Sequence, residues 1–377
     1  MSDLKEALLY EKFSSGVAMC ELCPRNCIIM PYRGDVCWES LSNLKKENLG
    51  FCGTRVNLKG KLYAINYGRV TSLDVDPIEK KPLFHFHPGN KVLSFGSFGC
   101  NLRCPNCHNW EISQTSSLIN SCPASALSIV KNFSAIEANE IVNQALENNC
   151  FGISYTFNEP TVSLEFVLEV MRLAHKAKLK NIWVTNGFFS QKTRKIILPW
   201  IDAANVDLKS FNQKFYRSHC KGSLITILRN IEAMGNQGIH LEISTLLLSK
   251  LNNDFQNLFQ LATFIVKRIS PYTPWHLLNF SASVSWQMQD WPSIDDQEIK
   301  KAFKIGKEAG LKFIYARRLQ ALNQEAKQEQ DSSQNISLDT FCSNCQALAV
   351  KRSEYAVERF DENGSCQKCG QKLFLDY

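Results

Sequence analysis

The sequence predicts an α/β fold, a partial TIM-type (β/α)6 barrel with small cysteine-rich metal modules at both ends. Three observations lead to this prediction. Short β-rich segments alternate with helical segments through the middle of the chain, three cysteines follow the first of these strands, and other cysteine clusters lie near the two ends. Strands that alternate with helices of this length indicate parallel βαβ units. In a barrel of such units, we expect the chemistry at the carboxyl ends of the strands.

The middle of the chain is predicted to contain strands at residues 91–98, 150–157, 181–186, 204–210, 240–248, 274–280 and 311–316. Helices are predicted between them, among them apolar-periodic segments at 161–178 and 224–234. A further helix is predicted to end at Glu147, with Ser134 and Glu137 as a capping box at its start. This number of units suits a full or partial barrel. The alternative is an open doubly wound sheet, although no GxGxxG follows a strand.

Changes in composition divide the chain into four segments. Residues 1–70 form a cysteine-rich N-terminal module, 71–318 the core barrel, 319–338 a polar Gln-rich linker, and 339–377 a zinc-ribbon-like module with the last cysteines. We expect the barrel to carry the chemistry and the last module to depend on a metal ion for its folding.

The composition is that of an ordinary globular protein, with 44% hydrophobic and 21% charged residues. The net charge of +7 is spread along the chain, which favours a solvated basic surface over a nucleic-acid partner. No apolar core of signal-peptide length and no apolar segment of about 20 residues is present, so we expect a cytoplasmic protein without a membrane partner. In that reducing compartment, the 15 cysteines indicate metal ligation rather than disulfides.

The central cysteines, Cys100, Cys104 and Cys107, have the spacing C-x3-C-x2-C directly after a strand. Such a loop can bind three irons of a [4Fe-4S] cluster, one with each thiolate, and leave the fourth iron open. In radical S-adenosyl-L-methionine (SAM) chemistry, the amine and carboxylate of SAM take that position. One electron then breaks the sulfonium bond, and the adenosyl radical abstracts a hydrogen from the substrate. The alternative is a zinc site completed by a distant ligand such as His108.

Several longer motifs make this pattern more specific. They are DPIEKKPLFHFHPG (76–89), GCNLRCPNCHNWEISQ (99–114), SYTFNEPT (154–161) and PWH (274–276). Together they resemble the radical SAM enzyme of the AmmeMemoRadiSam system, a family similar to the glycyl-radical (pyruvate formate-lyase) activating enzymes. The terminal cysteine motifs fit as well, so the resemblance covers nearly the whole chain. It implies the radical SAM barrel, the [4Fe-4S] cluster, SAM, an electron donor such as flavodoxin or ferredoxin, and partners of the Memo and AMMECR types.

The resemblance also implies cofactor contacts at the ends of two strands. Thr156, Asn158 and Glu159 stand where related enzymes hold the amino group of SAM, and a carboxylate there can accept from an ammonium. Thr185 and Asn186 end the next strand, where they contact either the ribose or methionine part of SAM or only form a turn before the following glycine.

Two later strands supply the remaining candidates. Asp207 and Lys209 alternate on one strand and so share a face. By resemblance, Lys209 binds the carboxylate of SAM and Asp207 holds Lys209 or a small cation, whereas a surface ion pair is the alternative. His276 resembles a histidine near the sulfonium, and a core histidine is its alternative.

Three positions depart from the family's pattern. Asn106 replaces the usual aromatic residue before the third cysteine. Leu278 lies where the PWH strand typically continues with arginine and His-Pro, and Arg317 lies where the last strand typically ends in Gly-Asn. These departures leave the cluster cysteines intact and place the difference on the substrate-facing half of the site.

The outer cysteine groups have different spacings. Cys342-x2-Cys345 and Cys366-x2-Cys369 are two knuckles of a zinc ribbon, with a second iron–sulfur cluster as the minority alternative. The N-terminal group consists of Cys20, Cys23, Cys27 and Cys52 and fits either zinc or an auxiliary cluster, with a knuckle-like turn after Cys52 slightly favouring zinc. The other four cysteines belong to none of these groups. Cys37 fits no family position and is treated as free, and Cys122, Cys150 and Cys220 show no ligand spacing and are expected to be small buried or incidental residues.

Three functions follow from these patterns. The first is a radical SAM enzyme that abstracts hydrogen from a small molecule or a protein. The second is an activase that installs a glycyl radical on a partner enzyme. The third is a zinc-binding scaffold without catalysis, which the open three-cysteine site argues against.

Overall fold

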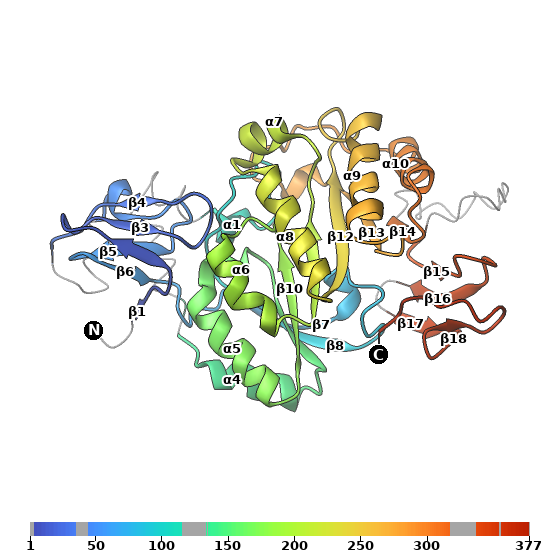
Figure 1. Cartoon of the computed structure of the whole chain (residues 1–377), viewed down its shortest axis with the longest axis horizontal. Helices are drawn as coiled ribbons and strands as arrows, with labels where there is room; N and C mark the ends of the chain where they lie inside the picture. Colours follow the sequence, from blue (N-terminus) through green and yellow to red (C-terminus); the bar gives the residue numbers. More distant parts are fainter. Residues whose placement is uncertain are drawn as a thin grey trace.

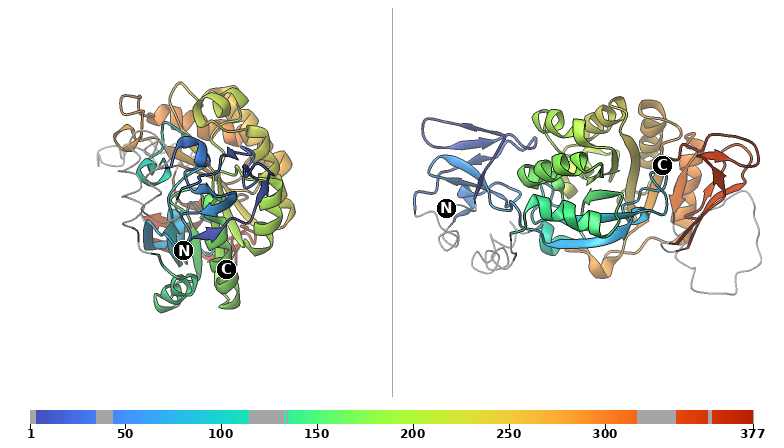
Figure 2. Two further views of the ribbon diagram at one scale, coloured as in Figure 1. Left: turned by 90° about the vertical axis from the view of Figure 1, so that its left-hand side faces the viewer. Right: turned by 90° about the horizontal axis from the view of Figure 1, so that it is seen from below.

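The computed structural model describes residues 4–34, 44–114, 133, 135–316, 337–353 and 356–376. A central α/β body has small β-sheet modules at its two opposite ends (Figure 1). The right-hand view of Figure 2, seen from below, also places the N-terminal module at one end and the C-terminal module at the other. The N-terminal and C-terminal cysteine groups are therefore on opposite sides of the central body.

The central sheet has eight strands, and each strand pairs with its neighbours in sequence. In order they are β7 (Ser72–Pro77), β8 (Lys91–Gly96), β9 (Gly152–Tyr155), β10 (Lys180–Thr185), β11 (Ala203–Asp207), β12 (His240–Leu247), β13 (Trp275–Asn279) and β14 (Ile314–Ala316). The strands from β8 to β14 are parallel, and β7 pairs antiparallel with β8. Because the edge strands β7 and β14 do not pair with each other, the barrel is partial, as the sequence predicts.

Helices follow the parallel strands and cover their outer face. The longer ones are α4 (Ala138–Glu147), α5 (Leu164–Lys176), α6 (Gln191–Ile197), α8 (Leu224–Asn236), α9 (Phe255–Arg268) and α10 (Asp296–Glu308). Shorter helical turns are η2 (Lys46–Asn48), η3 (Ile78–Lys80), α1 (Trp110–Ser113), η4 (Pro160–Ser163), η5 (Leu198–Trp200), α7 (Gln213–Phe215), η6 (Tyr216–Cys220) and η7 (Ala282–Val284). The central sheet contributes large buried side chains to the core, among them Tyr155, Trp183 and Trp275.

The capping prediction for α4 is wrong. The helix begins at Ala138, and its N-cap residue Glu137 makes no side-chain capping bond. Ser134 lies outside the described residues. A capping box does occur at α10, where the Asp295 and Glu298 side chains accept from each other's backbone N–H groups.

A polar network closes the amino-terminal end of the barrel. The carboxylate of Glu242 on β12 accepts from the backbone N–H groups of Phe84 and His85 at 3.0 and 2.7 Å. It also lies 3.1 Å from His240 Nε2 and 2.6 Å from His276 Nε2. The segment between β7 and β8 therefore plugs the end of the barrel opposite to the carboxyl ends of the parallel strands.

The N-terminal module consists of two three-stranded sheets, β1-β6-β5 and β2-β3-β4. Their strands are β1 (Lys5–Glu6), β2 (Tyr10–Lys12), β3 (Ala18–Cys20), β4 (Ile28–Ile29), β5 (Arg55–Leu58) and β6 (Lys61–Ala64). A buried ion pair of 2.8 Å joins Arg55 in this module to Glu165 on α5. This contact attaches the module to the central body.

The C-terminal module has a three-stranded and a two-stranded sheet, β15-β16-β17 and β18-β19. Their strands are β15 (Thr340–Phe341), β16 (Leu348–Ser353), β17 (Ala356–Arg359), β18 (Asp361–Glu362) and β19 (Ser365–Cys366). Arg352 Nη2 donates to the carbonyl of Phe84, and Asp376 lies 2.5 Å from His240 Nδ1. The module therefore docks on the plugged end of the barrel.

None of the helices in the described parts of the chain is long and apolar enough to cross a membrane.

Candidate functional site

A cavity of about 480 Å³ opens at the carboxyl ends of the parallel strands. The cysteines that line it, within the described part of the chain, are Cys100, Cys104 and Cys107. Its walls also include Thr156, Asn158, Glu159, Thr185, Asn186, Asn205, Asp207, Lys209, Leu246 and Leu278. The structure thus brings the three central cysteines and seven of the eight candidate cofactor contacts to one cavity.

The cysteine loop is held by side chains of the next strand end. Asn158 Oδ1 accepts from the Ser97 N–H at 3.1 Å, and Asn158 Nδ2 donates to the Gly99 carbonyl at 2.8 Å. Gly99 has a φ of +88°, a backbone conformation that residues with a Cβ rarely adopt. Both polar atoms of the Asn158 side chain are therefore used to position the start of the cysteine loop.

Burial makes free thiolates unfavourable in this loop. It raises the pKa of Cys100 above its ordinary value and that of Cys107 to about 11. A hydrogen bond with the Cys220 thiol, together with burial, raises the pKa of Cys104 well above its usual range. A metal cluster supplies the positive charge that draws such protons off. Three thiols facing a cavity lined by no further described cysteine fit a cluster with one open iron.

Glu159 is a buried carboxylate whose acceptor positions are filled. It accepts from the N–H and hydroxyl of Thr161, from the Asn186 N–H at 2.8 Å and from Thr185 Oγ1, which lies 2.9 Å from both carboxylate oxygens. Burial raises the pKa of Glu159 above its ordinary value. With these donors in place, Glu159 positions Thr185 and Asn186, and what it offers a bound ammonium is its charge rather than a free lone pair.

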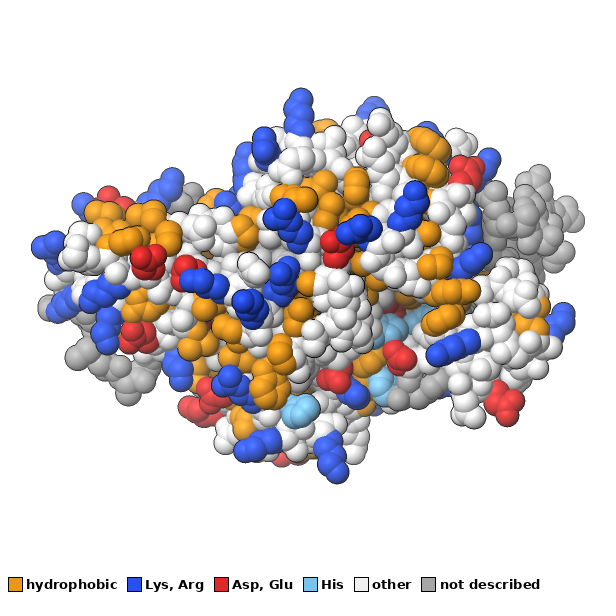
Figure 3. Space-filling view, in the orientation of Figure 1, with side chains coloured by type: hydrophobic (Ala, Val, Ile, Leu, Met, Phe, Trp, Pro, Cys, Tyr) orange, Lys and Arg blue, Asp and Glu red, His pale blue; other side chains and the backbone are white. Residues whose placement is uncertain are grey.

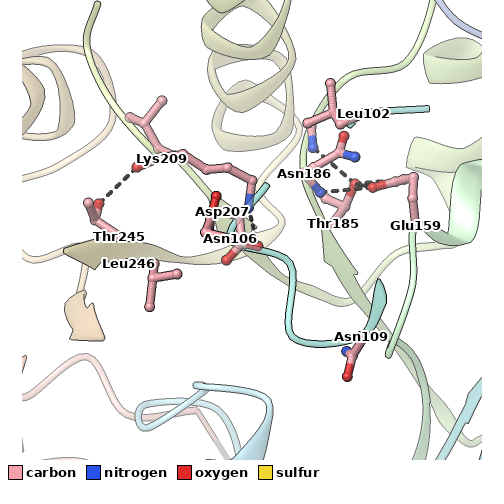
Figure 4. Close-up of polar contacts among 12 residues, drawn as sticks. Leu102, Asn106, Asn109, Glu159, Thr185, Asn186, Asp207, Lys209, Thr245 and Leu246 are labelled. Carbon is pink, nitrogen blue, oxygen red and sulfur yellow. Dashed lines mark hydrogen bonds and ion pairs between the residues drawn. The ribbon is translucent and has the colours of Figure 1, made fainter. Parts of the chain in front are cut away.

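Asn186 links the end of β10 to the cysteine loop. Its Nδ2 donates to Asn101 Oδ1 at 2.9 Å and lies 3.7 Å from Cys100 Sγ. Figure 4 shows Asn186 and Thr185 next to Glu159, with Lys209 and Asp207 facing the same space. Both side chains also hold the turn that follows, because the Gly187 N–H donates to Thr185 Oγ1 at 3.0 Å and the Phe188 N–H donates to Asn186 Oδ1 at 2.8 Å. The turn is therefore present, and contact of Thr185 and Asn186 with SAM stays a prediction.

Asp207 and Lys209 form an ion pair of 2.8 Å in the cavity wall. Burial opposes the charged form of Lys209, but attraction to Asp207 and to the neighbouring thiols outweighs it and raises its pKa well above the usual value. The side chain of Lys209 is 16% exposed and that of Asp207 is 41% exposed, so the pair is half-buried where it opens into the cavity. A half-buried cation with further N–H donors suits an anionic group of a ligand.

His276 is not brought to this cavity. It lies near the start of β13. Its Nε2 lies 2.6 Å from the Glu242 carboxylate, and its ring is stacked on that of Tyr315 with the ring centroids 5.2 Å apart. Leu278, two residues further along the strand, lines the cavity instead. The expected position near the sulfonium is thus corrected by the register of β13, and His276 belongs to the network at the barrel's plugged end.

Several lining residues were not predicted from the sequence. Asn205 lies two residues before Asp207, so the strand period would have revealed it. Lys80 and Lys81 come from the segment after β7, and Lys81 forms a buried ion pair of 2.6 Å with Asp76. Cys220 was expected to be a small buried or incidental residue and is fully buried, but no local spacing signals its contact with Cys104.

Two of the three positions that depart from the family pattern lie in the described part of the chain, and both line the cavity. Asn106 lines the cavity and its Oδ1 lies 2.8 Å from His219 Nε2. Leu278 also lines the cavity, so both of these differences face the space beside the cysteines. Arg317 lies outside the described residues, as do Cys37 and Cys122. Cys150 is buried away from the cavity.

The C-terminal cysteines form a compact group. The sulfurs of Cys342, Cys345, Cys366 and Cys369 all lie within 4.8 Å of one another, and the pairs 342–369 and 345–366 are 3.6 Å apart. A tetrahedral ion with metal–sulfur distances of about 2.3 Å places its ligands about 3.8 Å apart. This geometry therefore suits a single metal ion.

The N-terminal cysteines are arranged differently. Cys20 ends β3, and its backbone N–H donates to the Cys27 carbonyl at 2.9 Å. Cys23 lies in the turn between them, and Cys52 precedes β5. Among the described residues, the C-terminal group alone has its ligand atoms within 4.8 Å of one another, so the N-terminal sulfurs are more widely spaced.

Comparison with known proteins agrees with the site. The model of the radical SAM superfamily matches residues 95–262. The uncharacterized protein MJ0808 of Methanocaldococcus jannaschii is 33% identical over 373 residues, which is 98% of this chain and 99% of that protein. The 4-hydroxyphenylacetate decarboxylase activating enzyme of Clostridium scatologenes is 25% identical over 162 residues, 42% of this chain and 52% of that protein.

Two solved structures are also similar. A radical SAM methyltransferase from Sphaerobacter thermophilus is 14% identical with a TM-score of 0.46, covering 62% of this chain and 67% of that one. A domain of the pyruvate-formate lyase-activating enzyme from Bacteroides vulgatus is 17% identical with a TM-score of 0.39, covering 44% and 98%. The family model and the full-length relative show that the chain belongs to the radical SAM superfamily. It is a radical SAM enzyme, a class whose cofactors are a [4Fe-4S] cluster and SAM.

Proposed function

We propose that Cys100, Cys104 and Cys107 bind the [4Fe-4S] cluster and that SAM binds its open iron inside the cavity. The observation that carries this proposal is the convergence of three cavity-facing thiols with polar strand ends in a single space of about 480 Å³. Once bound, the cluster and SAM supply one chemistry, the reductive cleavage of SAM to a 5′-deoxyadenosyl radical that abstracts hydrogen from a substrate.

The residues of the cavity wall divide the binding of SAM between them. Lys209 donates to the carboxylate of the methionine part, and Asp207 fixes the direction of the lysine through their 2.8 Å ion pair. Thr156 and Asn186 offer polar groups at the ends of β9 and β10. Glu159 places a buried negative charge near the amino group while its hydrogen bonds hold Thr185 in position.

The proposal also includes the identity of the wider system. The motif resemblance supports a role as the radical SAM enzyme of the AmmeMemoRadiSam system, with partners of the Memo and AMMECR types and a flavodoxin or ferredoxin as electron donor. We expect each partner, expressed separately, to co-elute with this chain in size-exclusion chromatography. Separate elution of both the Memo-type and the AMMECR-type protein would count against the assignment.

A glycyl-radical activase is the second candidate function. It is favoured by the partial match to a protein named as a decarboxylase activating enzyme. An activase acts on a protein backbone, so its partner enzyme should gain a stable organic radical signal when incubated with this chain, SAM and a reductant. Formation of that signal would favour the activase over the first candidate.

The C-terminal cysteine group is proposed to bind zinc. Four thiolates at tetrahedral spacing form a closed site, and closed zinc sites are structural. Metal analysis of anaerobically purified protein tests both this assignment and the scaffold alternative. Zinc with no iron or sulfide would favour a scaffold without catalysis.

Electron paramagnetic resonance tests the central site. The reduced protein should give a cluster signal from the central site that changes when SAM is added, because SAM occupies the open iron. Cys104→Ala should abolish that change and remove about four irons. Cys150→Ala is the matched control, since Cys150 is buried but does not line the cavity. If Cys104→Ala retained both the iron and the response, the cluster assignment would be wrong.

A further inference from the structure

We propose that Cys20, Cys23, Cys27 and Cys52 bind a second iron–sulfur cluster, which passes electrons to the cluster at Cys100, Cys104 and Cys107. This inference rests on the proposed function of the central site. The four cysteines are referred to below as the N-terminal cysteine group. Three properties of the group carry the inference: the spacing of its sulfurs, an unsatisfied N–H group of a buried arginine beside it, and its contact with the central cysteine loop.

The spacing separates this group from the C-terminal one. All four N-terminal cysteines lie in the described part of the chain, yet their sulfurs do not meet the 4.8 Å limit that the C-terminal sulfurs meet. A single tetrahedral ion needs its ligands about 3.8 Å apart. In an iron–sulfur cubane, each thiolate binds a different iron, so the sulfurs lie farther apart. The N-terminal spacing therefore favours a cluster over zinc.

A buried guanidinium beside the group has one nitrogen without a hydrogen-bond acceptor. Arg55 is 1% exposed, and its Nη2 is paired with Glu165, but its Nη1 has no hydrogen-bond acceptor. Arg55 interacts electrostatically with the thiols of both Cys20 and Cys52. A buried donor without an acceptor is costly, and sulfides of an anionic cluster are acceptors for such donors. An anionic occupant of the N-terminal cysteine group would satisfy Arg55.

Two of these sulfurs have polar neighbours. The backbone N–H of Phe51 donates to Cys27 Sγ at 3.4 Å. Thr54 Oγ1 lies 3.1 Å from Cys52 Sγ and donates its own hydrogen to the Val162 carbonyl at 3.2 Å, so Thr54 accepts from the Cys52 thiol. Hydrogen bonds to cluster sulfurs and burial are among the features by which a protein sets a cluster's potential. The surroundings of the group are therefore suited to a redox cluster.

The group touches the loop of the central cysteines. A Cβ added to Gly99 would lie 2.6 Å from the Cys52 carbonyl oxygen and 2.5 Å from Thr54 Cγ2, so the two backbones meet directly before Cys100. Arg25, between Cys23 and Cys27, donates from Nε to the Asn101 carbonyl at 2.7 Å. Its charge interacts with the thiols of Cys23 and Cys27 and also with that of Cys100. Arg25 thus lies between the two cysteine groups.

The loops that carry these cysteines are fixed to the barrel at several points. The carbonyl of Leu22, next to Cys23, accepts from the Ser190 N–H at 3.1 Å and from Thr193 Oγ1 at 2.7 Å. The carbonyl of Phe51, next to Cys52, accepts from Arg103 Nη2 at 2.8 Å. Electron transfer falls steeply with distance, so rigid contact of this kind favours transfer between the two groups.

The outer side of the module faces solvent. Ile28, directly after Cys27, is 58% exposed, and Met30 is 44% exposed. Apolar side chains stand among Lys and Arg side chains over this end of the molecule (Figure 3). A low-potential one-electron donor such as reduced flavodoxin would deliver one electron here. The N-terminal cluster is then reduced by one electron and is reoxidised as the central cluster accepts that electron.

Metal content of the wild type is the first test, and it needs no variant. Two cubanes require about eight irons per chain, whereas zinc in the N-terminal cysteine group leaves about four. The double variant Cys20→Ser/Cys23→Ser should lose about four irons and keep the response of the central cluster to SAM. The matched control, Cys342→Ser/Cys345→Ser, should lose no iron. Unchanged iron in the first variant would overturn the proposal.

Two further variants keep the test decisive. Cys100→Ser/Cys104→Ser/Cys107→Ser should leave a cluster signal that does not respond to SAM. If this triple variant lost no iron and the wild type did not respond to SAM, the proposed function would fail while the N-terminal cluster stood. Arg25→Met keeps every ligand, so it serves where the double variant does not fold. Removing the positive charge should make the potential of the N-terminal cluster more negative, and an unchanged potential would contradict the proposal.

Discussion

The two outer modules each hold four cysteines in and between short β-strands, yet the two groups differ in spacing, burial and attachment. The C-terminal sulfurs lie within 4.8 Å of one another, and Cys369 is exposed. In the N-terminal module, Cys20, Cys23 and Cys52 are buried, and the sulfurs are more widely spaced. The same residue type therefore suits a single ion in one module and a cluster in the other.

Attachment separates the modules as clearly as spacing does. The C-terminal module docks on the plugged end of the barrel, away from the cavity, through Arg352 and Asp376. The N-terminal module contacts the cysteine loop at Gly99 and Asn101. Loss of metal from the C-terminal module should therefore have only local effects. Loss of metal from the N-terminal module should change the reduction of the central site.

The largest expected effect breaks the C-terminal side of the comparison. Cys366→Ser removes one of four ligands to an ion whose binding supplies about 10–16 kcal/mol in small zinc modules, so residues 339–377 should unfold. Hydrogen exchange should show loss of protection in β16 and β19. The central cluster should keep its iron and its response to SAM, and loss of that iron at normal expression would show that the modules are not independent.

The next effect tests how the N-terminal module is attached. Arg55→Met leaves the buried carboxylate of Glu165 without its partner, which should lower the free energy of unfolding by about 3–5 kcal/mol. The control is Arg268→Met, whose ion pair with Glu232 is on the surface and should contribute little. Denaturant unfolding of both variants measures the difference, and equal stabilities would contradict a structural role for the buried pair.

A pH dependence distinguishes the two attachments. Burial opposes the charged form of His240, but hydrogen bonds to Asp376 and Glu242 outweigh it and raise its pKa from 6.5 to about 9. Because the folded-state pKa is raised, this stabilisation is complete below pH 6.5 and is lost as the pH rises through 9, with a total of up to about 3 kcal/mol. Protection of the C-terminal module in hydrogen exchange should fall over that range. His240→Gln should remove the dependence, and a flat wild-type profile would contradict it.

The smallest effect concerns the cavity between the modules. Lys209→Met removes a charge-assisted bond of roughly 1.5–3 kcal/mol. Affinity for SAM should fall by about tenfold or more, since about 1.4 kcal/mol is a factor of ten. The metal content should not change, because lysine is not a ligand in any of the three cysteine groups. Calorimetric titration measures the affinity. The control is Lys180→Met, at the amino-terminal end of β10. An affinity of Lys209→Met equal to that of the wild type would show that Lys209 is not part of the site.

The seven parallel strands could be predicted because each buried segment is followed by a helical one. The edge strand β7 was missed, since its alternation of exposed and half-buried residues, including Val75 at 41% exposure, has no strong apolar pattern. Local spacing also identified the cavity-facing cysteines and the pair Asp207 and Lys209, because residues two apart on a strand share a face.

The remaining features depend on contacts between distant segments. His276 and Leu278 share a face of β13, and only the depth of the strand in the barrel decides which of them lines the cavity. Cys220 reaches Cys104 through the bond from the Arg103 N–H to the Cys220 carbonyl, which joins residues far apart in sequence. The choice between zinc and a cluster at the N-terminal cysteine group likewise requires distances that the spacing C-x2-C-x3-C does not set.

Formation of 5′-deoxyadenosine from SAM tests the central claim most directly. Anaerobic protein reduced with dithionite should release 5′-deoxyadenosine, and Cys150→Ala, which leaves the cavity untouched, should do the same. Cys104→Ala, which removes one ligand of the central cluster, should release none. No 5′-deoxyadenosine from wild-type protein with its full iron content, or equal amounts from Cys104→Ala, would contradict the assignment of Cys100, Cys104 and Cys107 as the centre that cleaves SAM.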